Sequence, residues 1–155
     1  MRLEIRDSTA CGLIQHPDFP ALRGLYIDEC AVKGLPDPRE KLEAYELMDS
    51  TGVLRAFGAY LDDDRLIGFI TVLAPVLPHY GITVAVAESL FVSPAYRKSG
   101  AGLKLIRAAE AHARAIHSPG LLLSSPLNGR LQTLLPRIGY AETNRVFLKR
   151  FSHAA

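Results

Sequence analysis

The feature that most constrains the fold is a strand that leads through a glycine-rich turn into a long amphipathic helix. Residues 82–92 predict the strand, because they are rich in β-branched side chains. Residues 100–117 predict the helix, because apolar side chains recur three or four positions apart. This apolar stripe consists of Leu103, Ile106, Ala109, Ala113 and Ile116. A helix with one apolar stripe must bury it, and we expect it to pack on a sheet that contains the preceding strand.

The rest of the sequence predicts further strands and helices in mixed order. Apolar runs predict strands at residues 3–5, 53–60, 66–77, 121–124 and 146–151. Helical spacing predicts helices at residues 20–33, 37–50 and 127–137. We therefore expect an α+β fold in one domain over residues 1–155. Its mixed, mostly antiparallel sheet should have six to seven strands flanked by about four helices.

The helix expected at residues 37–50 has the clearest start in the sequence. Asp37 offers an N-cap carboxylate, Pro38 takes the first helical position, and Glu40 lies three residues after the cap. This pattern predicts that the helix begins at Asp37.

Composition excludes several classes of function. A formal net charge of only +2 on 155 residues favours neither nucleic acid nor a membrane surface as the partner. The charged N-terminus does not predict a signal peptide, and no apolar run reaches the length of a membrane span. Two cysteines, Cys11 and Cys30, are too few for a disulfide scaffold. We therefore expect a cytoplasmic protein.

No set of residues has the spacing of metal ligands, so we expect no metal. The histidines that look like surface residues are His16, His112, His117 and His153. The acidic run at residues 62–64 could suggest a cation site, but a solvated hairpin loop is favoured.

The glycine-rich turn is a candidate phosphate site. The first N–H groups of a helix lack internal partners and lie at its positive end, while Gly100 and Gly102 let an anion approach the backbone. Leu105 interrupts the dinucleotide-binding pattern, and no Gly-Lys-Ser/Thr occurs. From these residues alone, a phosphate site and a plain helix-entry turn both stay open.

Three segments together suggest a family. The run from Arg97 to Gly102 resembles the R/Q-x-x-G-x-G/A signature of the GNAT superfamily of N-acetyltransferases, and residues 90–96 look like that family's fourth strand and turn. Asn128, eleven residues before Gly139, is similar to the family's second motif. The resemblance covers most of the chain. It implies that acetyl-coenzyme A (acetyl-CoA) is the cosubstrate and that an amine of a small molecule or a protein is the acceptor.

The resemblance also implies where the coenzyme binds. Its pyrophosphate would bind the backbone N–H groups of Arg97, Lys98, Ser99, Gly100, Ala101, Gly102 and Leu103. The pantetheine arm would lie along Leu90, Phe91 and Val92, where the fourth and fifth strands splay apart, and Asn128 would complete the site. The Val92 N–H would polarise the thioester carbonyl, as in an oxyanion hole.

Glu88 is the candidate base for the direct attack of an amine on acetyl-CoA. It matches the position where many family members carry a catalytic glutamate, and burial in an apolar strand would raise its pKa toward the working range. The alternative is that Glu88 pairs with an arginine or lies at a strand edge. His79 and Tyr80 are candidate acceptor contacts, and the alternative for them is an ordinary polar turn.

One position departs from the family pattern. Leu135 stands where the family often has a tyrosine that protonates the leaving thiolate. The candidate substitutes are Ser124, Ser125, Tyr80 and Tyr140, or the thiolate leaves unassisted. The departure keeps open a catalytically silent module of the same fold that binds acyl-CoA. A nucleotide-binding domain is a third hypothesis, and a homodimer is expected only by analogy with the family.

Overall fold

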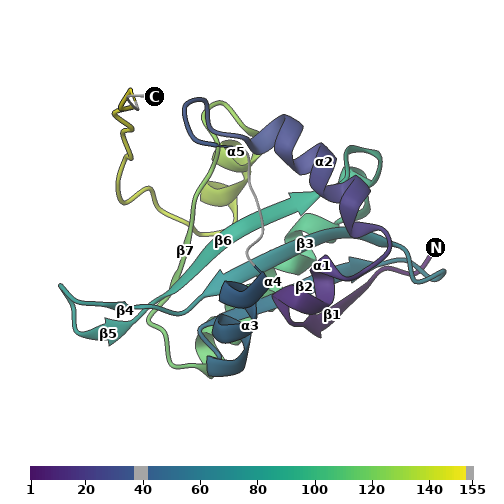
Figure 1. Ribbon diagram of the computed structural model, residues 1–155, viewed down its shortest axis with the longest axis horizontal. Helices are drawn as coiled ribbons and strands as arrows, with labels where there is room; N and C mark the ends of the chain where they lie inside the picture. Colours follow the sequence, from purple (N-terminus) through teal and green to yellow (C-terminus); the bar gives the residue numbers. More distant parts are fainter. Residues whose placement is uncertain (37–41, 153–155) are drawn as a thin grey trace.

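The computed structural model describes residues 1–36 and 42–152. A five-stranded sheet runs in the order β1 (Glu4–Ser8), β2 (Leu54–Tyr60), β3 (Leu66–Leu73), β6 (Ala85–Val92) and β7 (Leu121–Leu123), as Figure 1 shows. The first four strands are antiparallel, and β7 is parallel to β6. The short strands β4 (Val76–Leu77) and β5 (Ile82–Thr83) form a separate two-stranded sheet. The predicted α+β class and the mostly antiparallel sheet are confirmed.

Helices cover both faces of the large sheet (Figure 1). One face carries α1 (Ala10–Ile14), α2 (Phe19–Cys30) and α3 (Leu42–Thr51). The other face carries α4 (Ala101–Ala115), which follows the short 3-10 helix η1 (Pro94–Ser99). The last helix is α5 (Arg130–Arg137), beyond β7.

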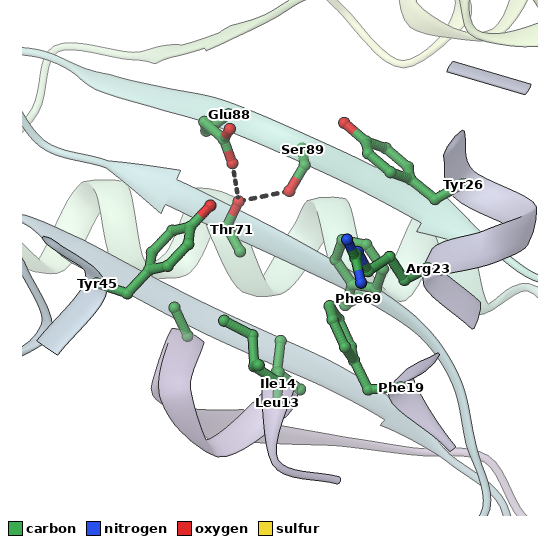
Figure 2. A pocket seen from close by; sticks show the side chains of 11 residues that line it. Leu13, Ile14, Phe19, Arg23, Tyr26, Tyr45, Phe69, Thr71, Glu88 and Ser89 are labelled. Atoms are coloured by element: carbon green, nitrogen blue, oxygen red, sulfur yellow. Dashed lines mark hydrogen bonds between the residues drawn. The ribbon is translucent and has the colours of Figure 1, made fainter. Parts of the chain in front are cut away.

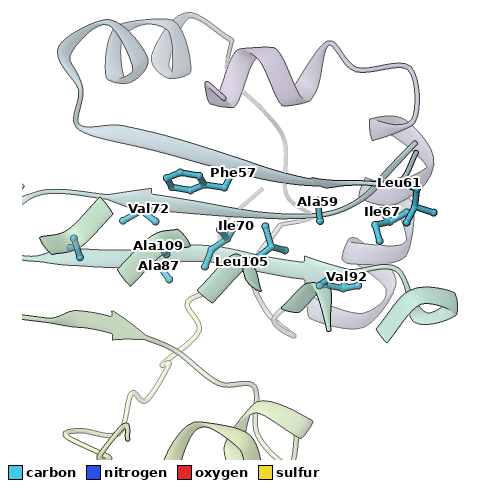
Figure 3. Close-up of a cluster of buried hydrophobic side chains, with 13 residues drawn as sticks. Phe57, Ala59, Leu61, Ile67, Ile70, Val72, Ala87, Val92, Leu105 and Ala109 are labelled. Atoms are coloured by element: carbon cyan, nitrogen blue, oxygen red, sulfur yellow. The ribbon is translucent and has the colours of Figure 1, made fainter. Parts of the chain in front are cut away.

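The α4 side holds the larger core cluster, drawn in Figure 3. Helical spacing turns Ala101, Leu105, Ala109 and Ala113 toward the sheet, and each is at most 3% exposed. Leu105 was absent from the stripe expected from the sequence, yet it is fully buried. Burying a leucine of this kind stabilises a fold by about 1.5–3 kcal/mol. The small alanines let the helix lie close to the strands.

The opposite face holds a second, more aromatic cluster. Leu13, Phe19 and Leu22 from α1 and α2 pack against Phe69 and Phe91 of the sheet. The sequence did not predict α1, which is only five residues long. Its start is stabilised from α3, because the Asp49 carboxylate accepts bonds of 3.0 Å from the N–H groups of Ala10 and Cys11. This contact joins α1 to α3 at the edge of the sheet.

Two sequence predictions about element ends have different outcomes. The predicted start of the third helix at Asp37, Pro38 and Glu40 lies outside the described residues, as does His153. The predicted last strand, residues 146–151, is wrong: the described residues after Tyr140 form neither helix nor strand. Its apolar side chains are exposed, with Phe147 at 89%, because no neighbouring strand pairs with them among the described residues. The large sheet therefore has five strands rather than six or seven.

Candidate functional site

A cavity of about 150 Å³ opens between the three N-terminal helices and the sheet (Figure 2). Strands β3 and β6 supply the inner wall, and α1, α2 and α3 supply the outer walls. Its apolar lining consists of Ala10, Leu13, Ile14, Phe19 and Phe69. Its polar lining consists of Arg23, Tyr26, Tyr45, Thr71, Glu88 and Ser89. Glu88 is the one carboxylate among these lining residues.

A β-bulge turns two consecutive side chains of β6 toward this cavity. Thr71 of β3 is opposite Ser89 and the next residue, Val72, is opposite Ala87, so Glu88 is an extra residue on β6. Consecutive side chains of a regular strand point to opposite faces, so with Ser89 facing the cavity a regular strand would put Glu88 on the α4 side. Because of the bulge, both Glu88 and Ser89 line the cavity, whereas Ala87 packs in the α4 cluster.

Three polar groups of the cavity form a hydrogen-bonded chain. The Thr71 hydroxyl donates to the Glu88 carboxylate at 2.8 Å, and it lies 2.6 Å from the Ser89 hydroxyl. A hydroxyl has a single proton to donate, so with Thr71 donating to an ionised Glu88, Ser89 donates to Thr71. The bonds therefore run in one direction, from Ser89 through Thr71 to Glu88. Figure 2 shows the three side chains together at one wall.

Glu88 is exposed, which differs from the burial expected from the sequence. The carboxylate bonds to the buried Thr71, while its own side chain faces the open side of the cavity. Its negative charge also acts on a neighbouring phenol. Burial, and after it the charge of Glu88, raises the pKa of Tyr26 to about 12. Tyr26 therefore keeps its proton at neutral pH.

Strands β6 and β7 separate at residues 88–92 of β6, beside the hydrogen-bonded side chains of Glu88 and Ser89. They pair only from Ala85 to Ala87 on β6, so the β7-facing edge of residues 88–92 is unpaired by β7. The Ser93 N–H donates to a β3 carbonyl at 2.8 Å, and alternation turns the Val92 and Leu90 N–H groups the other way. The backbone donors of both residues consequently face the gap between the strands.

The turn after β6 presents backbone amides at the start of α4. Gly100 has φ 84°, a left-handed conformation that favours glycine, and a side chain there would meet open space. Among the described residues, no side chain caps α4 at Gly100, and the Ala101 N–H makes only a long bond of 3.3 Å to Ser99 Oγ, which accepts it. The helix is 15 residues long, so its positive end coincides with this open backbone.

Arg97 is held by the protein, so its side chain is not a free cation in this turn. Its Nε donates to the Val92 carbonyl at 3.0 Å, and its guanidinium pairs with Glu29 of α2 and lies over the Phe91 ring. These contacts tie α2 to the turn. Lys98 is exposed and keeps its side chain at the surface.

The remaining candidates lie away from the cavity. His79 and Tyr80 are exposed at the tip of the β4–β5 hairpin and are not among the cavity's lining residues. Asn128 is exposed in the turn before α5, where its N–H donates to Gln132 at 3.1 Å. The alternative proton donors to the thiolate are also absent from the cavity's lining residues.

Leu135 is 7% exposed and packs in the protein. Tyr140 donates to Glu110 of α4 at 2.9 Å, and burial together with this bond raises its pKa well above the usual value. Ser124 is exposed, and the Ser125 hydroxyl donates to the Pro126 carbonyl at 3.2 Å. None of these four residues lines the cavity.

The acidic side chains of the hairpin loop at residues 62–64 form ion pairs. Asp63 pairs with Arg65 at 2.7 Å, and Asp64 pairs with Arg6, so the loop carries its own counter-charges.

Among residues 1–36 and 42–152, no group of three histidine, cysteine or acidic side chains could hold a metal ion. None of the described helices is long and apolar enough to cross a bilayer.

The sequence profile of the acetyltransferase (GNAT) family matches residues 18–130. The fold, the gap between β6 and β7, and the open start of α4 agree with this assignment. The chain therefore belongs to the acetyltransferase (GNAT) family, and it is an acetyltransferase. A sequence search against curated proteins finds no match.

Solved structures share the fold at low sequence identity. The Brucella melitensis biovar Abortus 2308 ribosomal-protein-alanine N-acetyltransferase has a TM-score of 0.70 at 20% identity, covering 97% of this chain and 100% of its own. The Acinetobacter baumannii aminoglycoside antibiotic 6'-N-acetyltransferase has a TM-score of 0.70 at 22% identity, covering 99% and 100%. The Arabidopsis thaliana glucosamine-6-phosphate N-acetyltransferase has a TM-score of 0.75 at 14% identity, covering 98% and 100%.

Proposed function

We propose that this protein transfers an acetyl group from acetyl-CoA to a primary amine, which attacks directly in a ternary complex with Glu88 as the base. The observation that carries the proposal is the chain from Ser89 through Thr71 to Glu88 at the wall of the cavity. An alkylamine is mostly protonated at neutral pH, so attack requires a group that removes its proton. Glu88 supplies that group at an exposed position that an acceptor can reach.

The chain of hydroxyls offers the proton a path. Ser89 is one position nearer than Glu88 to Val92 on β6, so an amine held at the Ser89 hydroxyl would pass its proton to Glu88 through the Thr71 hydroxyl. As Ser89 Oγ accepts the amine proton, Ser89 passes its own proton to Thr71 and Thr71 passes its proton to Glu88. The amine loses one proton and the carboxylate gains one.

The residues around the gap between β6 and β7 fit the coenzyme. The open left-handed backbone at Gly100 and the uncapped start of α4 provide room and N–H donors for a diphosphate. Leu90 and Val92 turn backbone donors into the gap, where a pantetheine arm would lie parallel to the strand. Acetyl-CoA would supply the activated acetyl group, and the Val92 N–H would stabilise negative charge on its carbonyl oxygen.

The leaving thiolate departs without a tyrosine in this proposal. Leu135 cannot donate a proton, and Tyr26 has a pKa of about 12. Proton transfer from such a phenol to a thiolate, whose thiol has a pKa of about 8.5, is unfavourable.

We propose the cytoplasm as the location, supported by the free thiols of Cys11 and Cys30.

Glu88→Gln tests the proposal, because it keeps the size of the side chain and removes the base. We expect kcat for thiol release from acetyl-CoA to fall by about 100-fold or more, which is within the usual contribution of a general base. Calorimetric titration should show acetyl-CoA affinity unchanged within about twofold, because Glu88 lies outside the expected coenzyme contacts. Glu142→Gln, at an exposed glutamate outside the cavity, is the matched control and should leave kcat unchanged.

A catalytically silent acyl-CoA-binding module is the second candidate function, favoured by the buried Leu135 at the usual tyrosine position. This candidate predicts coenzyme binding with no amine-dependent thiol release, and therefore no effect of Glu88→Gln. The third hypothesis, a nucleotide-binding domain unrelated to acyl transfer, is set aside by membership of the acetyltransferase family.

A further inference from the structure

We infer that the acceptor is a compact primary amine with a single positive charge and an apolar body about the size of one six-membered ring. The inference rests on the proposed function and concerns the same cavity. It names the chemistry of the acceptor, which the family assignment leaves open.

One wall of the cavity is apolar. Leu13, Phe19 and Phe69 are at most 8% exposed and line it together with the half-buried Ile14. The Phe19 and Phe69 rings are 5.7 Å apart and pack as one aromatic surface. Water is held poorly by such a lining, so a ligand that replaces it with apolar surface gains affinity.

The volume of the cavity limits the size of the acceptor. The cavity measures about 150 Å³. An apolar cavity of about 150 Å³ lined by leucine, isoleucine and phenylalanine is large enough to bind benzene. An acceptor the size of an aminoglycoside or a polypeptide would extend far beyond this space.

The charged side chains of the cavity limit the charge of the acceptor. Among the described residues that line the cavity, Glu88 is the single carboxylate, so it can pair with one ammonium group. In the view of Figure 2, the Arg23 guanidinium overlaps the Phe69 ring, and Ser89 lies between it and Glu88. Arg23 already has an interaction within the protein, and its positive charge repels a second ammonium at that end. The lining therefore disfavours polyamines.

These three features orient the acceptor. Figure 2 shows the apolar residues of α1 and α2 on one side and the chain from Ser89 to Glu88 on the other. The amine would lie at Ser89 and Glu88, next to the gap between β6 and β7. The apolar body would lie against Ile14, Phe19 and Phe69.

A series of unbranched alkylamines tests the inference, with thiol release from acetyl-CoA as the readout. Each added methylene should raise kcat/KM by about fourfold, from about 0.8 kcal/mol per buried methylene, until the cavity is full. Benzylamine and isoamylamine should exceed spermidine, kanamycin and glucosamine 6-phosphate by about tenfold or more. A peptide with an N-terminal alanine should react no faster than those polar acceptors.

Two variants of Ile14 sharpen the test. Ile14→Asp adds a carboxylate to the apolar wall, so kcat/KM for benzylamine should fall about tenfold while that for spermidine rises. Ile14→Phe fills part of the cavity and should shift the optimum to shorter alkylamines. Leu47→Asp is the matched control, since Leu47 is 65% exposed on α3 and does not line the cavity. It should change neither preference.

The outcomes separate this inference from the proposed function. Faster reaction of the polyamine, the aminoglycoside, the sugar phosphate or the peptide would overturn the inference and leave the transferase proposal standing. A flat alkylamine series would also overturn it. Acetyl-CoA binding with no reaction of any amine would overturn the transferase proposal itself.

Discussion

Replacing Thr71 by valine removes the central hydroxyl of the cavity while keeping a side chain of similar shape. Thr71 is only 8% exposed, and its oxygen makes the 2.8 Å bond to Glu88 and the 2.6 Å bond to Ser89. A hydrogen bond to a charged group contributes about 1.5–3 kcal/mol. If this contribution acts fully in the transition state, its loss lowers kcat by about 10- to 150-fold, at 1.36 kcal/mol per factor of ten.

The assay is thiol release from acetyl-CoA with saturating acceptor, together with thermal unfolding. Thr71→Val should lower kcat, leave coenzyme affinity unchanged and lower Tm by no more than about 12 °C, since the loss of a bond of about 1.5–3 kcal/mol corresponds to about 2–4 °C per kcal/mol in a protein of this size. Thr71→Ser keeps a hydroxyl and should restore kcat to within about fivefold of the wild type. Ser89→Ala should reproduce part of the loss.

Rescue by serine separates a proton path from simple packing. If Thr71 only fills space, the smaller serine should lower kcat at least as much as valine does. A Thr71→Val protein that keeps kcat within about twofold, or a serine variant that fails to restore it, would refute the relay.

Two further predictions concern stability. Burial, and after it the charge of Arg55, lowers the pKa of His112, whereas Asp7 acts in the opposite direction. A histidine whose pKa is lower in the folded state than its ordinary 6.5 contributes to the stability of the fold above pH 6.5. This contribution is lost as the pH falls from 6.5 through the folded pKa. The Tm of His112→Gln should therefore fall less than the Tm of the wild type between about pH 7.5 and pH 5. Equal falls would contradict this role of His112. A chain ending at Thr143 removes the exposed C-terminal segment and should unfold within about 2 °C of the full chain, because exposed residues contribute little to the free energy of unfolding. A fall of more than about 5 °C would mean that the segment pairs as a strand after all.

Much of the fold could be predicted from the sequence, because the signals were local. The apolar stripe of residues 100–117 became α4, and β-branched residues near Val92 became β6. The open turn at Gly100 was also expected, since glycine adopts a left-handed conformation without the strain of a side chain. The segment at residues 146–151 had a strand-like pattern too, but a strand also needs a partner, which the pattern does not specify.

The candidate site depended on contacts that no local pattern contains. The sequence pointed to Glu88. Thr71 and Ser89 could be assigned to the site only from the register in which β3 and β6 pair. The sequence carries no signal of the bulge, because residues 85–87 and 90–92 are all apolar and show no alternation whose phase could change at Glu88.

The sequence alone determined which segments bury an apolar face and where the backbone opens at the start of a helix, because both follow from spacing along one element. The tertiary structure decided which polar groups meet. The bulge turned Glu88 to the same face as Ser89, and the five-residue helix α1 brought Leu13 and Ile14 opposite them. Strand register and helix docking are set by the packing of residues far apart in the chain, and that packing assembled the cavity.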